Sequence, residues 1–378
     1  MRHGFFQKVF SLRRRKQFFA WQIEITTRCP LSCRMCIRQG LSEWASADMS
    51  LNNFEKLIPY FHDVETIILQ GWGEPLLHND LCAMIRAAKG GTETTRGSHR
   101  HAKAPSPSVG FVTSGKGLND HYSAELIDAG IDFIGFSFAG STAKTHEGIR
   151  LNSDFQELVH AVGAFNELKK KRGVPGLRTH IVYLMLKDNL QDIPALPRLA
   201  RDIGIRDIVL VNLIHVTTPW QDSQKVFSCD ERGDVTDILN ETQERAREAG
   251  VHLRCPSLTA HETPLCDENP LRNLYISVTG DVSPCVYLYP PTTHQFKRIF
   301  CGQEHGIEQL GFGNILQEDF SRIWNSRGYR EFRGQFHRRV TSAGKRYSPF
   351  WLMSGGKGAS PLPDPPAPCR TCHKMLGV

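Results

Sequence analysis

The sequence lacks any apolar run long enough to cross a bilayer, and it lacks a strong excess of charge of either sign. Hydrophobic residues make up 40% of the chain and charged residues 22%, with a net charge of +7, so we expect a globular protein without a transmembrane helix. Residues 1–20 are basic and aromatic, and Arg13 to Lys16 interrupt any signal-like apolar core. We therefore expect no export signal and a cytoplasmic location. No RNA or DNA motif accompanies the basic clusters, so neither a nucleic acid nor a membrane is expected as a partner.

Cysteine is the residue type that the sequence has in excess. The chain has 11 cysteines, and without an export signal they indicate thiolates that bind metal rather than disulfides. Their distribution is uneven, because Cys29, Cys33 and Cys36 lie within eight residues and Cys369 and Cys372 lie near the end. This distribution predicts two metal sites.

Short apolar segments alternate with amphipathic ones from Trp21 to about Ile214. The predicted strands are Gln22–Thr27, Glu65–Gln70, Val109–Ser114, Asp132–Phe138, His180–Leu186 and Asp207–Ile214. The predicted helices between them are Leu51–Tyr60, Leu77–Ala88, Asp120–Ala129, Phe155–Lys171 and Ile193–Ile203. Six successive βα units predict an α/β fold with a parallel sheet, and a curved partial (β/α)6 barrel is one way to close it. In that fold the chemistry belongs at the carboxyl ends of the strands.

The rest of the chain divides around this barrel. We expect a basic helical segment at 1–20, the barrel at 21–252 and a small C-terminal α+β domain at 253–378. Gly90–Ser108 has the composition of a surface insertion, and Thr341–Pro368 that of a long connection. The other predicted elements are a helix at Asp237–Ala249, a hairpin of Leu274–Val278 with Val282–Leu288, and a helix at Glu318–Phe332.

The first cysteines form a C-x3-C-x2-C pattern directly after a predicted strand. Three soft thiolates from Cys29, Cys33 and Cys36 suit either an iron–sulfur cube or zinc. In a cube, one iron would lack a protein ligand and remain open to a substrate or cosubstrate. In a zinc site, a distant His or Cys would complete the shell.

Motifs at the following strand ends carry a resemblance to a known family. Gln70-Gly71-Trp72-Gly73-Glu74-Pro75 follows the second strand, Phe111 to Gly115 the third, and Phe136 to Gly140 with Ile149-Arg150 the fourth. Together with the cysteine pattern they resemble the radical S-adenosylmethionine (SAM) superfamily. The sequence departs from that family at Met35, where an aromatic residue is usual, at Ala139, where Asp is usual, and at Trp72, where glycine is usual.

The resemblance implies a radical SAM barrel and its cofactors. Cys29, Cys33 and Cys36 would hold a [4Fe-4S] cluster whose open iron binds SAM, and reductive cleavage of SAM would give a 5′-deoxyadenosyl radical that abstracts hydrogen from a substrate. The residues implied to bind SAM are Gly73, Glu74, Ser114, Ser137, Arg150 and Asn189. Two roles are open for the Arg150 guanidinium: a bidentate contact with the SAM carboxylate, or an ordinary surface ion pair.

A second set of four cysteines completes a site without an open position. These are Cys266, Cys285, Cys369 and Cys372, and their number alone suits either a [4Fe-4S] cluster or zinc. Their context resembles the SPASM/twitch extensions of radical SAM enzymes, which implies one auxiliary [4Fe-4S] cluster. Cys255 and Cys301 are alternative ligands, and Cys82 is expected to be a buried small side chain.

The resemblance favours a maturase that modifies a peptide or protein, with a reductant such as ferredoxin or flavodoxin. A similarity to maturases associated with tungsten-dependent oxidoreductases is also noted. The alternatives are a radical SAM dehydrogenase of small molecules, an iron–sulfur electron carrier and a zinc-binding scaffold. No catalytic residue is assigned, since the polar residues near the predicted site edges are expected to be turn, cap or core residues. These are His215, Asp267, Glu268, Asp281 and Tyr287.

Overall fold

The computed structural model describes residues 16–41, 43–90, 106–228, 233–292, 294–346 and 361–378. In this part of the chain, nine strands form one sheet in the order β7-β6-β5-β4-β3-β2-β1-β8-β9. They are β1 (Phe18–Ile23), β2 (Val64–Ile68), β3 (Ser108–Thr113), β4 (Phe133–Phe138), β5 (Arg178–Met185), β6 (Asp207–Asn212), β7 (His252–Arg254), β8 (Asn273–Ile276) and β9 (Val282–Ser283). Neighbouring strands are parallel except β8 and β9, which pair antiparallel. The predicted partial (β/α)6 barrel is confirmed, with β1 to β6 as its six strands.

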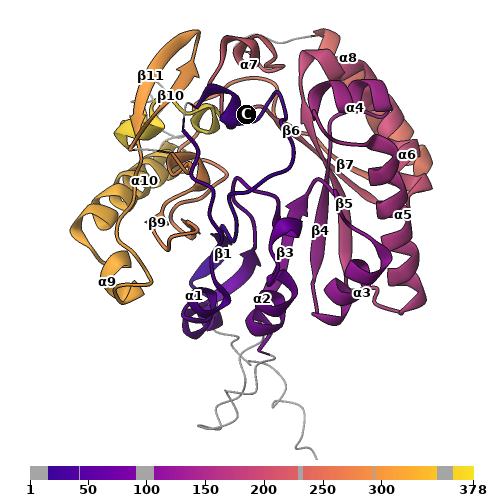
Figure 1. The fold of residues 1–378 in the computed structure, drawn as a ribbon. Helices are drawn as coiled ribbons and strands as arrows, with labels where there is room; N and C mark the ends of the chain where they lie inside the picture. Colours follow the sequence, from indigo (N-terminus) through magenta and orange to yellow (C-terminus); the bar gives the residue numbers. More distant parts are fainter. Residues whose placement is uncertain (1–15, 42, 91–105, 229–232, 293, 347–360) are drawn as a thin grey trace, which may run out of the picture.

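Helices cover the outer face of the curved sheet (Figure 1). They are α1 (Leu51–Glu55), α2 (Leu81–Ala88), α3 (Asp120–Asp128), α4 (Ala143–Ile149), α5 (Phe155–Lys171), α6 (Leu196–Asp202) and α8 (Gly233–Ala249). Side-chain caps fix several of their starts. Asp154 accepts from the N–H of Glu157 at 2.8 Å to begin α5, and Thr142 caps α4 in the same way.

Along the strands, successive side chains point alternately to the core and to the barrel interior. In β5 the side chains of Thr179, Ile181, Tyr183 and Met185 are buried, whereas those between them are half-buried. Val182 and Leu184 line a cavity inside the barrel. Because paired residues of parallel strands point to the same side of a sheet, the register that joins Ser137 to Val182 turns Ser137 toward this interior as well.

The C-terminal part of the chain continues the main sheet and adds a second layer. Strand β8 lies beside β1, so the barrel sheet extends into this region. Beyond it come an antiparallel hairpin of β10 (Gln295–Phe300) and β11 (Gln303–Glu308) and the helices α9 (Phe320–Trp324) and α10 (Arg327–Arg346). Figure 1 shows the hairpin and α10 on the side of the sheet opposite α5 and α6. A small apolar core, built around Phe296, Phe332 and Phe336, includes Cys369.

Several predicted elements differ from the observed ones. The single helix expected at Glu318–Phe332 is two helices, because Asp319 caps α9 and a second start follows at Arg327. Helix α10 continues to Arg346, into the segment expected to be a connection. The segment Leu51–Tyr60 is α1 followed by the 3-10 turn Ile58–Asp63. The basic helical segment at 1–20 falls mostly on residues outside the described ones, and its end, Phe18–Ala20, is strand.

Candidate functional site

The first cysteine set lies on the loop that follows β1. Its backbone is held by the residues after α4, since the N–H groups of Ser32 and Arg34 donate to the carbonyls of Leu151 and Ile149 at 3.1 and 2.9 Å. On the other side, Nε2 of Gln221 in α7 (Pro219–Ser223) donates to the Cys36 carbonyl at 2.9 Å. The loop is therefore fixed by barrel elements before any metal binds.

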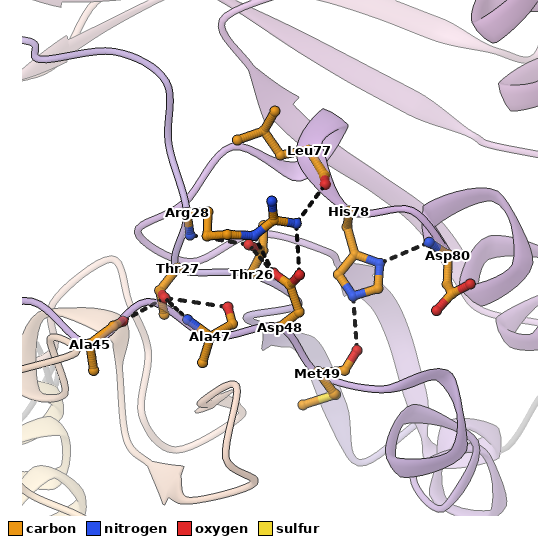
Figure 2. Close-up of polar contacts among 10 residues, drawn as sticks. All are labelled: Thr26, Thr27, Arg28, Ala45, Ala47, Asp48, Met49, Leu77, His78 and Asp80. Atoms are coloured by element: carbon orange, nitrogen blue, oxygen red, sulfur yellow. Dashed lines mark hydrogen bonds and ion pairs between the residues drawn. The ribbon is translucent and has the colours of Figure 1, made fainter.

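Figure 2 shows how the start of this loop is tied to the turns beside it. The Arg28 guanidinium donates to both carboxylate oxygens of Asp48, at 2.9 and 2.7 Å, and to the Leu77 carbonyl at 2.8 Å. Asp48 also accepts from the Thr26 hydroxyl at 2.6 Å. His78 donates from Nε2 to the Met49 carbonyl and accepts at Nδ1 from the Asp80 N–H. These contacts join the segments that follow β1 and β2, at the residue that directly precedes Cys29 in the chain.

The turn after β2 packs against the same backbone. The Glu74 N–H donates to the Arg28 carbonyl at 2.7 Å. A Cβ at Gly73 would overlap the carbonyl oxygens of Thr26 and Arg28, so only glycine permits this approach. Gly73 is therefore the point at which the turn after β2 approaches the backbone of the cysteine loop.

Glu74 is buried, and its carboxylate points to the end of β3. It accepts from the Thr113 hydroxyl at 2.5 Å, and from the backbone N–H and hydroxyl of Ser114 at 2.7 Å each. Glu74 and Ser114, both predicted to bind SAM, are thus brought together and bond each other. The side chain of Glu74 joins two strand ends, which leaves the backbone of the turn to face the interior.

The other predicted SAM-binding residues lie at the ends of β4 and β5. Ser137 faces the barrel interior, and Arg150 ends α4 with Nη1 3.9 Å from the Cys33 sulfur. Both polar atoms of the Asn189 amide already have partners: Oδ1 accepts from the Leu186 N–H, and Nδ2 donates to the carbonyls of Ala139 and Leu184. Asn189 therefore shapes the wall of the site by fixing the ends of β4 and β5.

The three thiols of the first set occupy a poorly hydrated position. Burial raises the pKa of Cys29, and it raises the pKa of Cys36 to about 11. Protonated thiols in such a position bind metal with loss of the proton, because only the thiolate is a ligand. The Arg150 guanidinium places a positive charge beside the Cys33 sulfur.

The second set of cysteines converges from three separate segments. Cys266 precedes β8, Cys285 follows β9, and Cys369 and Cys372 flank a short turn near the end of the chain. Burial, followed by mutual repulsion among these sulfurs, raises the pKa values of Cys266 and Cys369, that of Cys266 to about 12. Four thiols that share one buried position make a donor set for a cluster or a soft metal ion.

Two buried arginines hold the segment that carries the last cysteines. Arg298 of β10 donates to the carbonyls of Pro368 and Tyr287, at 3.0 and 3.1 Å. Arg339 of α10 donates to the Thr263 carbonyl at 2.8 Å and also to the carbonyl of Pro363. Burial raises the pKa of Cys369, and both guanidiniums oppose that shift. They therefore fix the backbone and favour the thiolate at the same time.

The donor chemistry of both sets fits an iron–sulfur cluster, which binds through Cys thiolates. Every cysteine among the described residues is a free thiol. In the same residues, no group of three or more His, Cys, Asp and Glu side chains is arranged to hold a metal ion directly. A zinc site would bring its sulfurs together around one ion, at about 2.3 Å from it. A cube holds its ligands further apart, because each thiolate binds a different iron.

One cavity lies between the two sets. Its volume is about 540 Å³, and Cys36 and Trp72 line it from the barrel side. Asp267, Tyr287 and Lys374 line it from the C-terminal side, and each of them lies within two residues of a cysteine of the second set. The size is that of an ordinary ligand site.

The remaining cysteines belong to neither of the two sets. Cys82 is buried on α2, as expected. Cys301 is exposed in the turn between β10 and β11, and Cys255 is exposed after β7 and lines the cavity. Cys229 lies outside the described residues. Of the polar residues expected in turns, Asp281 accepts from Thr279 at 2.6 Å within the β8–β9 turn.

Sequence reasoning missed functional features that depend on tertiary contacts. Asn212 and Arg254 line the cavity, and Arg298 supports the second cysteine set. Asn212 ends β6 and lies near the end of the predicted strand Asp207–Ile214; this position is a signal, because chemistry in a barrel gathers at such ends. Nothing in the local sequence distinguishes Arg298 from a surface arginine.

Comparisons with known proteins agree with this geometry. The radical SAM superfamily matches residues 23–200, and the SPASM iron–sulfur cluster-binding domain matches residues 266–347. A tungsten-containing aldehyde ferredoxin oxidoreductase cofactor-modifying protein of Pyrococcus furiosus is 26% identical over 318 residues, which are 82% of each chain. A PqqA peptide cyclase of Streptomyces rochei is 22% identical over 322 residues, 82% of this chain and 77% of the relative.

A solved structure shares the fold. The crystal structure of Streptococcus suis SuiB bound to S-adenosylmethionine superposes with a TM-score of 0.60 and 14% identity, over 84% of this chain and 68% of that one. Among the described residues, no helix has the length and apolarity needed to cross a membrane. The sheet order, the cysteine loop after β1 and these matches together show that the chain is an enzyme of the radical SAM superfamily with a C-terminal SPASM iron–sulfur cluster-binding domain.

Proposed function

We propose that this enzyme is a maturase that modifies a peptide or protein substrate in the cavity between two iron–sulfur clusters. Cys29, Cys33 and Cys36 hold the [4Fe-4S] cluster that binds SAM at its open iron. Cys266, Cys285, Cys369 and Cys372 hold one auxiliary [4Fe-4S] cluster. When bound, the first cluster and SAM supply a one-electron cleavage that generates a hydrogen-abstracting 5′-deoxyadenosyl radical.

The observation that carries this proposal is the position of the cavity. Cys36 lines one side of it, and Tyr287 and Lys374, next to the second cysteine set, line the other. A substrate in this cavity would contact residues beside both cysteine sets, and clusters held by these sets would supply the one-electron chemistry for its oxidation. Peptide modification is favoured because a relative that covers most of the chain bears the name of a peptide cyclase.

The protein residues contribute positioning and the exclusion of water. The backbone of the turn at Gly73, the Ser137 hydroxyl and the Arg150 guanidinium are the groups proposed to orient SAM, and Glu74 holds the turn in place through Ser114. Apolar interior side chains such as Val182, Leu184 and Val211 surround the cavity, which protects a reactive radical from water. We further propose a cytoplasmic location and a ferredoxin or flavodoxin as the electron donor.

The test begins with anaerobically reconstituted protein, SAM and a reductant, and measures 5′-deoxyadenosine. Combined Cys29→Ala, Cys33→Ala and Cys36→Ala substitutions should abolish its formation while the auxiliary cluster and its absorption remain. Cys82→Ala, which removes a thiol from α2 outside both sets, is the matched control and should keep full activity. SAM cleavage that survives the triple substitution would refute the assignment.

The substrate class is tested separately by mass spectrometry. Peptides encoded by neighbouring genes are incubated with the active enzyme, and a mass change that depends on SAM supports the maturase proposal. If 5′-deoxyadenosine forms and small alcohols are oxidised while every peptide keeps its mass, the enzyme is a dehydrogenase of small molecules instead.

A further inference from the structure

Three side chains in the cavity carry buried polar atoms that have no hydrogen-bond partner. They are Trp72 with Nε1, Asn212 with Oδ1, and His215 with both ring nitrogens, and all three line the cavity that Cys36 also lines. We call Trp72, Asn212 and His215 the polar cluster. Each unpaired polar group in such a position destabilises the folded protein, and a bound ligand with the right donors and acceptors would remove that cost.

Asn212 defines what the ligand must offer. Its Nδ2 donates to the Ser257 carbonyl at 2.9 Å, and since a carbonyl only accepts, this bond fixes the orientation of the amide. The unpaired atom is therefore Oδ1, which requires a donor from the ligand. A carboxylate or an ester carbonyl offers none.

His215 adds one donor and one acceptor. Its side chain is 5% exposed, and its ring packs near Trp72, Tyr287 and Phe296, with centroids 5.5, 5.8 and 5.5 Å away. Burial, with Arg298 and His373 nearby, lowers its pKa well below the ordinary value, so the neutral ring keeps one N–H and one bare nitrogen. A rotation about χ2, which has a broad energy profile, turns a ring nitrogen toward the ligand.

Trp72 completes the cluster with a donor. Its backbone N–H donates to the buried Glu24 carboxylate at 2.8 Å, which anchors the residue at the end of β2. Its indole therefore stands beside His215, with the rings nearly perpendicular at 79°. The cluster offers two acceptors, on Asn212 and His215, and two donors, on His215 and Trp72.

We propose that the polar cluster binds a secondary amide of the substrate, with Asn212 accepting from the amide N–H and Trp72 or His215 donating to its carbonyl. This inference rests on the proposed function and specifies it, because a peptide unit presents one donor and one acceptor, on opposite edges of its planar trans amide. In this role His215 and Asn212 are substrate-binding residues that select amides over acids and esters.

Two small probes of equal shape test the proposal. N-methylacetamide and methyl acetate differ by one N–H in place of one oxygen, and methyl acetate contains no amide. Binding of each to the reconstituted full-length protein is measured by saturation-transfer NMR. We expect the ester to bind about three- to tenfold more weakly than the amide, which is the loss of one neutral hydrogen bond.

Variants separate the polar cluster from the rest of the barrel. Asn212→Ala and His215→Phe should remove the preference for the amide, and His215→Gln, which keeps a donor and an acceptor, should restore part of it. His180→Phe is the matched control: His180 lies near the amino end of β5, away from the cluster, and its loss should leave the preference intact. Equal binding of both probes to the wild-type protein, or a preference that persists in His215→Phe and Asn212→Ala, would overturn the inference.

The same preparations are assayed for SAM cleavage, so that the two proposals fail in different ways. Cleavage by a wild-type protein that binds both probes equally refutes amide recognition alone. A wild-type protein that prefers the amide but cannot cleave SAM refutes the proposed function and leaves the binding site standing. A variant that loses both its amide preference and its thermal transition has unfolded, and the His215→Gln protein then decides the outcome.

Discussion

Oε2 of Glu74 accepts hydrogen bonds from both the backbone N–H and the hydroxyl of Ser114, each at 2.7 Å. Glu74 follows β2 and Ser114 follows β3, so this pair joins two neighbouring strand ends at the edge of the sheet that carries the proposed site. Thr113 adds a third donor to the same carboxylate. A carboxylate with its acceptor capacity used in this way acts as a support for the turn that carries Gly73.

Glu74→Ala tests that support. It leaves the donors of Thr113 and Ser114 buried without a partner, and we expect a loss of about 2–4 kcal/mol in the free energy of unfolding. SAM should also bind more weakly, because the turn at Gly73 loses its anchor. Glu125→Ala, which removes a carboxylate from the partly exposed face of α3, is the control. Thermal unfolding and equilibrium dialysis with SAM measure the two effects, and a Glu74→Ala protein equal to the control in both would contradict the role.

Arg28→Lys tests the contacts drawn in Figure 2. The ion pair with Asp48 is about two-fifths exposed on each side, so its direct contribution to stability is below about 1 kcal/mol. The guanidinium also bonds the Leu77 carbonyl, and an ammonium cannot make this contact and the bidentate one together. We therefore expect little change in thermal stability but faster loss of iron to a chelator from the first cluster.

The control for Arg28→Lys is Arg198→Lys, which alters a surface ion pair on α6. Iron release is followed by absorbance after adding a chelator under anaerobic conditions. Equal release rates in the two variants would show that Arg28 does not stabilise the cysteine loop.

The buried Glu24 carboxyl group should make the free energy of unfolding depend on pH. Burial raises its pKa to about 7, whereas an unfolded glutamate titrates near 4.5. The folded state therefore binds the proton more tightly. The stability that comes from this proton is fully present below pH 4.5 and is lost as the pH rises through about 7.

Glu24→Gln removes this titration and keeps an acceptor for the Trp72 N–H. Relative to the wild type, the variant should gain stability as the pH rises from 4.5 to about 7, and the gain should stay at about 3 kcal/mol above pH 7. Thermal unfolding at several pH values measures the difference between the two proteins, which cancels effects common to both. A difference that is constant with pH would mean that Glu24 is ionised throughout.

The sequence predicts the barrel strands to within a few residues, because β-branched and apolar residues mark them and successive βα units leave one topology. It does not predict α4, which is only seven residues long. It also does not predict the β10–β11 hairpin, because one residue of the Cys301-Gly302 turn is a cysteine in the left-handed conformation, at φ 50°, and cysteine is not a typical turn residue. The two cysteine sets can be found from spacing. The polar cluster cannot, because the unpaired state of Asn212 and His215 depends on packing between distant segments.

Arg298 is another residue whose role depends on contacts between distant segments, and its substitution tests that role. Its guanidinium is 1% exposed and donates to the carbonyls of Pro368 and Tyr287, and Pro368 directly precedes Cys369. Arg298→Met removes the bonds and the charge that favours the thiolate, while a side chain of similar length fills the space. We expect the auxiliary cluster to be lost, so that the purified protein holds about half of the wild-type iron, while SAM cleavage at the first cluster persists.

Lys297→Met is the matched control, since Lys297 is the neighbouring residue of β10 but is exposed and pairs only with Glu304 across the hairpin. Iron content, absorption spectra and 5′-deoxyadenosine formation are compared in the two variants. Full iron content in Arg298→Met would show that Pro368 and Cys369 hold their positions without the guanidinium. Loss of all iron, with loss of SAM cleavage, would show instead that the two cysteine sets fold as one unit, because β8 extends the barrel sheet into the C-terminal region.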